Sequence, residues 1–160
     1  MFAVECTAVS RALGSNTIAI HHIGSTAIPF VYAKAIIDML VEVADIEEVD
    51  EHNPAMEALG YEPMGECGIS GRRYFRKDND ASVRTHHAHV FAAGRPDIVR
   101  HLAFRDFLLA HAEWATRYSD LKKKLAQAHP DDIDLYMAGK DAFIKDIDKK
   151  AAVWRTGLDG

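Results

Sequence analysis

Hydrophobic residues in the first half of the chain occur in short β-branched runs or alternate with polar residues, which is the pattern of strands. Residues 17–23, TIAIHHI, form one such run, and Gly24 and Ser25 follow it directly. This order predicts a strand that ends in a tight turn. Residues 35–43, AIIDMLVEV, predict a second strand a short distance further along the chain.

The second of these strands carries acidic residues on one of its two faces. Alternation places apolar side chains on one face and, on the other, Asp38, Leu40 and Glu42. Burying an unpaired carboxylate is strongly unfavourable, so Asp38 should lie at a strand end, in a cleft or beside a cation. Asp38 is therefore the first candidate for chemistry, as a metal ligand or as a base.

The rest of the chain predicts further strands and then helices. Residues 45–59 predict a helix that Pro54 either breaks or restarts. Three short strands are expected next, in YEPMGE at 61–66, GRRYFRK at 71–77 and RTHHAHVF at 84–91. Beyond Pro96 apolar residues recur at helical spacing, and Asp132 is a candidate N-cap for a last helix. These elements predict an α/β (α+β) fold, a mixed sheet flanked by helices with a helical C-terminal half, in one domain over residues 1–160.

Composition and charge restrict the possible partners. The 160 residues are 48% hydrophobic with a formal net charge of −5, which suits one compact domain. An acidic chain lacks the excess of Lys and Arg that sequence-independent binding to long nucleic acids requires, although a mononucleotide is compatible with this charge. The longest basic run, Lys122-Lys123-Lys124, lies in a predicted helix and is expected to form a solvated face.

The sequence also predicts a compartment. No apolar stretch approaches the roughly 20 residues needed to cross a bilayer, so no membrane association is expected. The two cysteines, Cys6 and Cys67, form no CxxC pair, and the first twenty residues do not read as an export signal. The expected location is therefore the cytoplasm.

The stretch HIGSTAIPFVYAKAIIDMLV, residues 22–41, resembles the signature of the GrpB family. The similarity continues through RRYF, THHAHVF, LAFRDFLLAH and YSDLKKKLA and covers roughly residues 20–145. It implies a nucleotidyltransferase-like fold, in which the turn after the first strand holds nucleotide phosphates and acids on the next strand hold a divalent metal ion. Some members of this family are fused behind a dephospho-CoA kinase.

The chain departs from these patterns at three positions. Phe30 stands where the GrpB pattern has glycine, and Ala35 stands where it has proline. Leu40 occupies the position at which nucleotidyltransferases normally carry a second metal-binding acid two residues after the first. The strand therefore lacks one of the acids that hold the usual pair of metal ions.

The candidate phosphate-binding residues come from both halves of the chain. In the turn, a glycine lets the backbone approach an anion while free N–H groups and a serine hydroxyl supply donors. Basic and aromatic residues elsewhere are expected to add contacts to phosphate or to close the far wall of the pocket. The complete set of candidates is Gly24, Ser25, Thr26, Lys34, Arg73, Arg105, Tyr136 and Lys140.

Histidines are the candidates that replace the missing acid. His87 and His89 alternate on one face of a predicted strand, and His22 lies near the end of another. Together with Asp38 they offer three imidazoles and a carboxylate, which suit zinc or another transition ion better than magnesium. The alternative is a polar face that binds a ligand by hydrogen bonds without any metal ion.

Three functions follow from these candidates. The first is a nucleotidyltransferase-fold protein that binds a nucleotide or another small phosphate-containing ligand with Mg, Mn or Zn, and transfers a nucleoside monophosphate to a small acceptor. The second is a non-catalytic binding module connected with coenzyme A, which the absence of an acid at Leu40 favours. The third is a transition-metal hydrolase that uses the histidines.

Overall fold

The fold is described from a computed structural model, which covers residues 2–29, 31 and 36–159. Within it the chain divides into two compact units. The first comprises Met1–Gly24 with Ala35–Ile98, and the second comprises Ser25–Lys34 with Val99–Gly160. A single domain over the whole chain stays a prediction.

The first unit is built on one mixed sheet. Its helices are α1 (Phe2–Leu13), α2 (Glu48–Glu51) and α3 (Asn53–Ala58), and its strands are β1 (Thr17–Ile23), β2 (Ile37–Val43), β3 (Tyr61–Pro63), β4 (Arg72–Asp78) and β5 (Arg84–Ala92). The strands follow the order β1-β2-β5-β4-β3, in which β2 and β5 are parallel and the other pairs are antiparallel. The predicted strands and the mixed sheet are thus confirmed.

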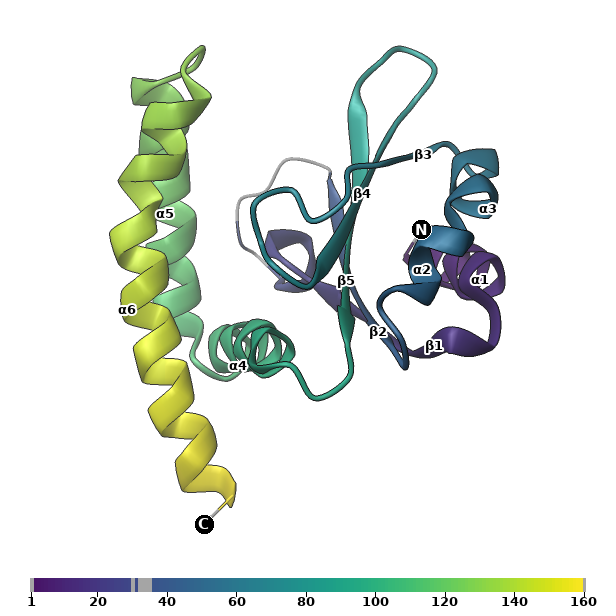
Figure 1. The fold of residues 1–160 in the computed structure, drawn as a ribbon. Coiled ribbons are helices and arrows are strands. Elements are labelled where there is room, and N and C mark those ends of the chain that lie inside the picture. Colours follow the sequence, from purple (N-terminus) through teal and green to yellow (C-terminus); the bar gives the residue numbers. More distant parts are fainter. Residues whose placement is uncertain (1, 30, 32–35, 160) are drawn as a thin grey trace. The chain divides into compact units, whose positions relative to one another are not determined.

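One face of this sheet forms the hydrophobic core of the first unit. Met39 and Val41 of β2 are fully buried there and belong to the same cluster as Val9 of α1 and Met56 of α3. Figure 1 shows α1, α2 and α3 gathered on one side of the strands. The predicted alternation therefore holds over the described strand, Ile37–Val43, and Asp38 projects from the opposite face, whereas residue 35 of the predicted strand lies outside the described residues.

Two local features explain the helices of this unit. Pro54 lies in the first turn of α3, where its missing N–H costs nothing, so the predicted helix is divided into α2 and α3. Helix α1 was not predicted from the sequence. This helix buries Val9 and Leu13 completely, and its apolar face becomes evident only when the sheet that covers it is known.

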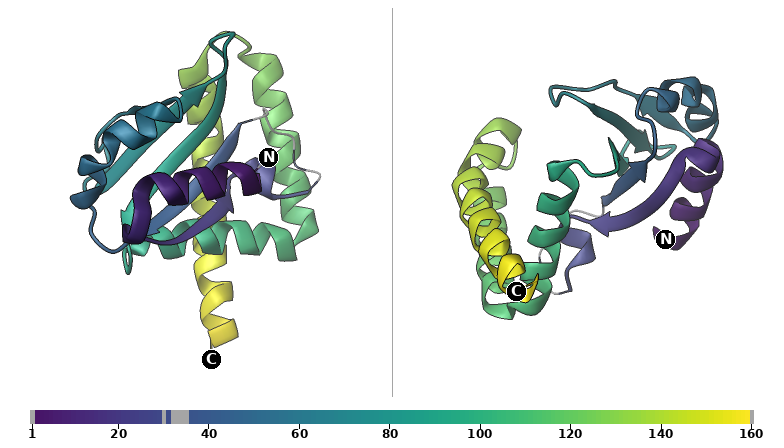
Figure 2. Two further views of the ribbon diagram at one scale, coloured as in Figure 1. Left: turned by 90° about the vertical axis from the view of Figure 1, so that its right-hand side faces the viewer. Right: turned by 60° about the horizontal axis from the view of Figure 1, so that its bottom comes forward.

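The second unit is helical. It contains a short 3-10 turn η2 (Ser25–Ala27), most of α4 (Pro96–Ala110), α5 (Ala112–Ala128) and α6 (Ile133–Asp159). Oδ1 of Asp132 accepts a hydrogen bond from the backbone N–H of Leu135 at 3.1 Å, which confirms the predicted N-cap. Helices α5 and α6 run side by side (Figure 2). No helix in the described part of the chain is both long and apolar enough to span a membrane.

A half-buried carboxylate joins α1 to the strands. Oε1 of Glu5 lies 2.8 Å from Nζ of Lys77, and the hydroxyl of Tyr61 donates to Oε2 of Glu5 at 2.7 Å. Burial raises the pKa of the Glu5 carboxyl, but the hydrogen bonds from Lys77 and Tyr61 outweigh this effect and lower it. A carboxyl whose pKa is lower in the folded chain stabilises the fold above its ordinary pKa, and this contribution is lost as the pH falls through the lowered value.

Glu5→Gln is therefore expected to lower the free energy of unfolding at neutral pH by about 1–3 kcal/mol. The difference from the wild type should shrink as the pH falls below the ordinary glutamate pKa of about 4.3 and through the lowered pKa of Glu5, because the wild-type carboxyl then becomes protonated. Urea unfolding at several pH values measures both effects. Glu62→Gln is the control, since Glu62 pairs with Arg76 on an exposed surface and should contribute little. A difference that does not change with pH would contradict the linkage.

Candidate functional site

The candidate site lies on the sheet face opposite α1, α2 and α3. Strands β2 and β5 are parallel, with Asp38 beside His87 and Leu40 beside His89. Because partners in register point to the same side of a sheet, Asp38, His87 and His89 share this face. Three of the four predicted metal ligands, Asp38, His87 and His89, thus lie on one face of the sheet, and their binding of a metal ion stays a prediction.

The three side chains form a compact cluster. Oδ1 of Asp38 lies 3.1 Å from Nδ1 of His87 and 3.5 Å from Nε2 of His89. One nitrogen or oxygen atom from each residue lies within 4.8 Å of the corresponding atom in the other two, the spacing of a possible metal site. The side chains are 17–26% exposed, so a ligand can reach them from solvent.

The electrostatics of the cluster keep Asp38 ionised. Burial raises the pKa of the Asp38 carboxyl, but hydrogen bonds from His87 and His89, together with their positive charge when protonated, outweigh burial and hold this pKa at about 2. A carboxylate that is ionised at all physiological pH values is a ready ligand for a cation.

Gly24 makes room for this carboxylate. Its φ is +75°, a conformation that favours glycine, and a Cβ atom on it would lie 2.6 Å from Oδ2 of Asp38. A separation below 3.0 Å would force one of the two residues to move. The glycine at the end of β1 is thus required for close packing against Asp38, in addition to its conformation.

Two residues of β4 complete the face. The ring of Tyr74 lies 5.6 Å from that of His87 and 5.4 Å from that of His89, between ring centroids. Nη1 of Arg72 lies 3.3 Å from Nδ1 of His89 and can only donate to it. Nε2 of His89 therefore carries the proton of the neutral ring and faces Asp38. Tyr74 was not among the predicted site residues, and of the adjacent Arg72 and Arg73, either of which fits the site face on sequence grounds, Arg73 was the one selected.

The sequence model of the GrpB protein family matches residues 1–150. The chain belongs to the GrpB family. UPF0157 protein YqkA of Bacillus subtilis is 50% identical to this GrpB-family chain over 156 residues, which cover 98% of the chain and 45% of YqkA. The crystal structure of the conserved protein GrpB from Enterococcus faecalis matches with a TM-score of 0.89 and 51% identity, covering 94% of this chain and 89% of that one.

A more distant relative is named for an activity. A dephospho-CoA kinase of Mycolicibacterium paratuberculosis is 26% identical over 169 residues, which cover 91% of this chain and 42% of the kinase. The GrpB-family chain thus spans less than half the length of either YqkA or this kinase. The resemblance to the GrpB family that the signature predicted is confirmed.

Two predicted site residues lie on the wrong face of the sheet. His22 of β1 pairs with Met39, which places it on the helix-covered side, where its ring stacks on Phe2 with centroids 4.7 Å apart. Arg73 faces the same side, and its Nε lies 2.8 Å from Oδ1 of Asp50. Alternation within a strand does not tell which of two neighbouring residues faces the site. In the structure His21 and Arg72 face it, and His22 and Arg73 do not.

The remaining candidates belong to the second unit of the GrpB-family chain or lie outside the described residues. Lys34 is among the latter. Arg105 forms an ion pair with Asp106 at 2.9 Å, and Nζ of Lys140 lies 4.8 Å from the ring centroid of Tyr136. Their predicted contacts with a phosphate ligand stay predictions, as do those of Ser25 and Thr26 in η2.

Lys122 corrects another expectation. The basic run at 122–124 was expected to form a solvated helix face, but Lys122 is only 5% exposed. Its ammonium group donates a hydrogen bond to Oγ of Ser25 and lies 5.2 Å from the ring centroid of Tyr118. The structure thus assigns a buried cation to the serine that the sequence selected for phosphate binding.

Proposed function

We propose that this GrpB-family chain binds a nucleotide or another small phosphate-containing ligand through a divalent transition-metal ion held by Asp38, His87 and His89. The observation that carries the proposal is the convergence of three ligand atoms within 4.8 Å of one another. Two imidazoles and a carboxylate suit zinc and related ions better than magnesium. Three coordinating residues also leave a coordination position on the metal ion for a phosphate oxygen of the bound molecule.

The residues around the ion have separate tasks in this proposal. A bound divalent ion would neutralise negative charge on phosphate oxygens. Asp38 supplies the permanent negative charge, and Gly24 keeps the carboxylate in place by leaving space beside it. If the chain is an enzyme, the reaction is transfer of a nucleoside monophosphate from a nucleoside triphosphate to a small acceptor: the acceptor oxygen bonds to the α-phosphorus, and pyrophosphate leaves. Hydrolysis is the version in which water is that acceptor.

A second candidate is a metal-free binding module, which one contact favours. Arg72 donates a hydrogen bond to Nδ1 of His89, so Nε2 carries the ring proton. A metal ion bound at Nε2 would require this proton to lie on Nδ1 instead, and the hydrogen bond from Arg72 would be lost. In this version Arg72 and the two histidines bind phosphate oxygens directly. The relative named dephospho-CoA kinase makes coenzyme A precursors sensible ligands to test.

Binding of zinc, manganese and magnesium to the purified protein, measured by isothermal titration calorimetry, tests the proposal. Zinc is expected to bind with one-to-one stoichiometry, and Asp38→Asn should weaken it about a hundredfold, because a neutral amide replaces an anionic ligand. Glu42→Gln is the matched control. Glu42 lies on the same strand and face, but its carboxylate pairs with His21 at 2.6 Å.

Thermal unfolding with ATP, GTP and dephospho-CoA then separates the two candidates. A shift in the melting temperature that requires the metal ion and is lost in Asp38→Asn supports metal-dependent binding. A shift that persists without metal and is lost in Arg72→Gln supports the metal-free module instead. Absence of both zinc binding and any ligand-dependent shift would overturn the proposed function.

A further inference from the structure

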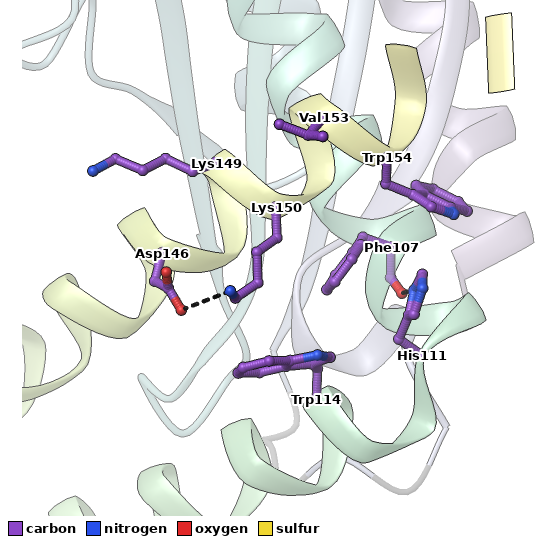
Figure 3. A pocket seen from close by; sticks show the side chains of 8 residues that line it. All are labelled: Phe107, His111, Trp114, Asp146, Lys149, Lys150, Val153 and Trp154. Carbon is purple, nitrogen blue, oxygen red and sulfur yellow. Dashed lines mark hydrogen bonds and ion pairs between the residues drawn. The ribbon is translucent and has the colours of Figure 1, made fainter. Parts of the chain in front are cut away.

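An aromatic pocket in the second unit lies outside every site described above. It is a shallow pocket, open to solvent, with a volume of about 520 Å³, which is within the range of small-molecule sites. Residues from the end of α4, the start of α5 and the last part of α6 line it, as Figure 3 shows. They include both tryptophans of the chain, Trp114 and Trp154.

The aromatic side chains that line the pocket contact one another. The ring of His111 stacks on Phe107 with centroids 4.1 Å apart, and both rings meet Trp154 edge-on at 5.4 and 5.9 Å. Nδ1 of His111 lies 2.8 Å from the backbone oxygen of Phe107. Because a carbonyl oxygen only accepts, Nδ1 carries the proton and Nε2 of the neutral ring can accept a hydrogen bond from a ligand.

The charges at the pocket favour an anion. Nζ of Lys150 lies 4.9 Å from the ring centroid of Trp114, and the guanidinium of Arg117 lies 4.5 Å from the same ring. The indole therefore already has cations beside it, which disfavours a cationic ligand. The pair between Lys150 and Asp146 is 3.8 Å long, beyond hydrogen-bond length, so the ammonium group keeps donors for an anionic acceptor.

We propose that this pocket binds a small ligand with a planar aromatic ring and an attached phosphate or carboxylate group. The ring packs against Phe107 and Trp154, and the anionic group lies on Lys150 beside Trp114. Figure 3 shows Lys150 reaching toward Trp114, whereas Lys149 points away from it. The two adjacent lysines thus form a matched pair for a test. The proposal uses no residue of the Asp38 cluster and does not depend on the proposed function.

The indole N–H signals in a ¹H–¹⁵N NMR spectrum report on this pocket alone, because both tryptophans line it. The probes are 2-naphthoate and AMP, each compared with its uncharged counterpart, 2-naphthamide or adenosine. At least one acid is expected to shift both indole signals in a saturable way and to bind about fivefold more tightly than its neutral counterpart. Binding of 2-naphthoate would indicate a carboxylate ligand, and binding of AMP would indicate a nucleotide phosphate.

Lys150→Gln should weaken binding of that acid about fivefold without changing its neutral counterpart, whereas Lys149→Gln should leave both unchanged. Asp38→Asn should also leave the indole shifts unchanged, which separates this pocket from the metal cluster. The proposal is overturned if neither acid moves the indole signals at millimolar concentration. Equal binding of acid and neutral probe, or equal effects of the two lysine variants, would overturn it as well.

Discussion

Gly24→Ala is expected to lower the free energy of unfolding by about 2–4 kcal/mol and to weaken zinc binding about tenfold or more. Alanine is strained at a φ of +75°, and its Cβ would lie 2.6 Å from Oδ2 of Asp38. The methyl group therefore displaces the carboxylate from its position beside His87. Urea unfolding measures the change in stability, and calorimetric titration measures the change in zinc affinity.

Gly14 provides the matched control. It has a similar φ of +67°, but a Cβ atom there would meet nothing within 4 Å. Gly14→Ala should therefore cost only about 1–2 kcal/mol and leave zinc binding unchanged. In an Asp38→Ala background the extra cost of Gly24→Ala should shrink, since the nearest carboxylate atoms are removed. Equal costs at the two glycines in the wild-type background would contradict a close approach of Gly24 to Asp38.

Alternation along a strand predicted which residues share a face, but it did not relate one strand to the next. Within β5 it correctly separated His87 from His86. For the adjacent pair His21 and His22 in β1, either residue fits the site face on sequence grounds. The antiparallel register decides the matter, because it places His22 opposite Met39 on the core side.

The arginines of β4 and Lys122 of α5 also could not be placed from the local sequence, because contacts with distant residues decide where they lie. Arg72 and Arg73 have equal claims until the pairing of β4 with β5 places Arg72 on the site face. Lys122 was predicted to be exposed to solvent because consecutive lysines in a helix usually form a solvated face. Its partner, Ser25, lies 97 residues away in the sequence, and no local pattern reveals such a contact.

The GrpB signature predicted the position of the candidate site better than its chemistry. It directed attention to Gly24 and Asp38, which the structure brings into contact. The sequence of β2 alone shows that Leu40 replaces a second acid. It does not show that the imidazoles of His87 and His89, on β5, lie beside Asp38. The parallel pairing of β2 with β5 is therefore the step that turns a single acid into a three-residue cluster.

Removing either imidazole of the cluster should have a large effect on metal binding. His87→Ala and His89→Ala are each expected to weaken zinc binding about a hundredfold, since each removes one of three protein ligands. The stability of the metal-free protein should change much less, because both side chains are only partly buried. Calorimetric zinc titration of each variant, with unfolding curves recorded without metal, measures the two effects separately.

Two other histidines of β1 are the controls, and each tests a different part of the geometry. His22→Ala should leave zinc binding unchanged because His22 lies on the opposite face of the sheet. His21 lies on the site face but pairs with the carboxylate of Glu42 at 2.6 Å, so His21→Ala should also leave zinc binding unchanged. If His22→Ala weakens zinc binding as strongly as His87→Ala, the metal site does not follow the sheet register. If only His21→Ala weakens it, the metal ion binds at Glu42 instead of Asp38.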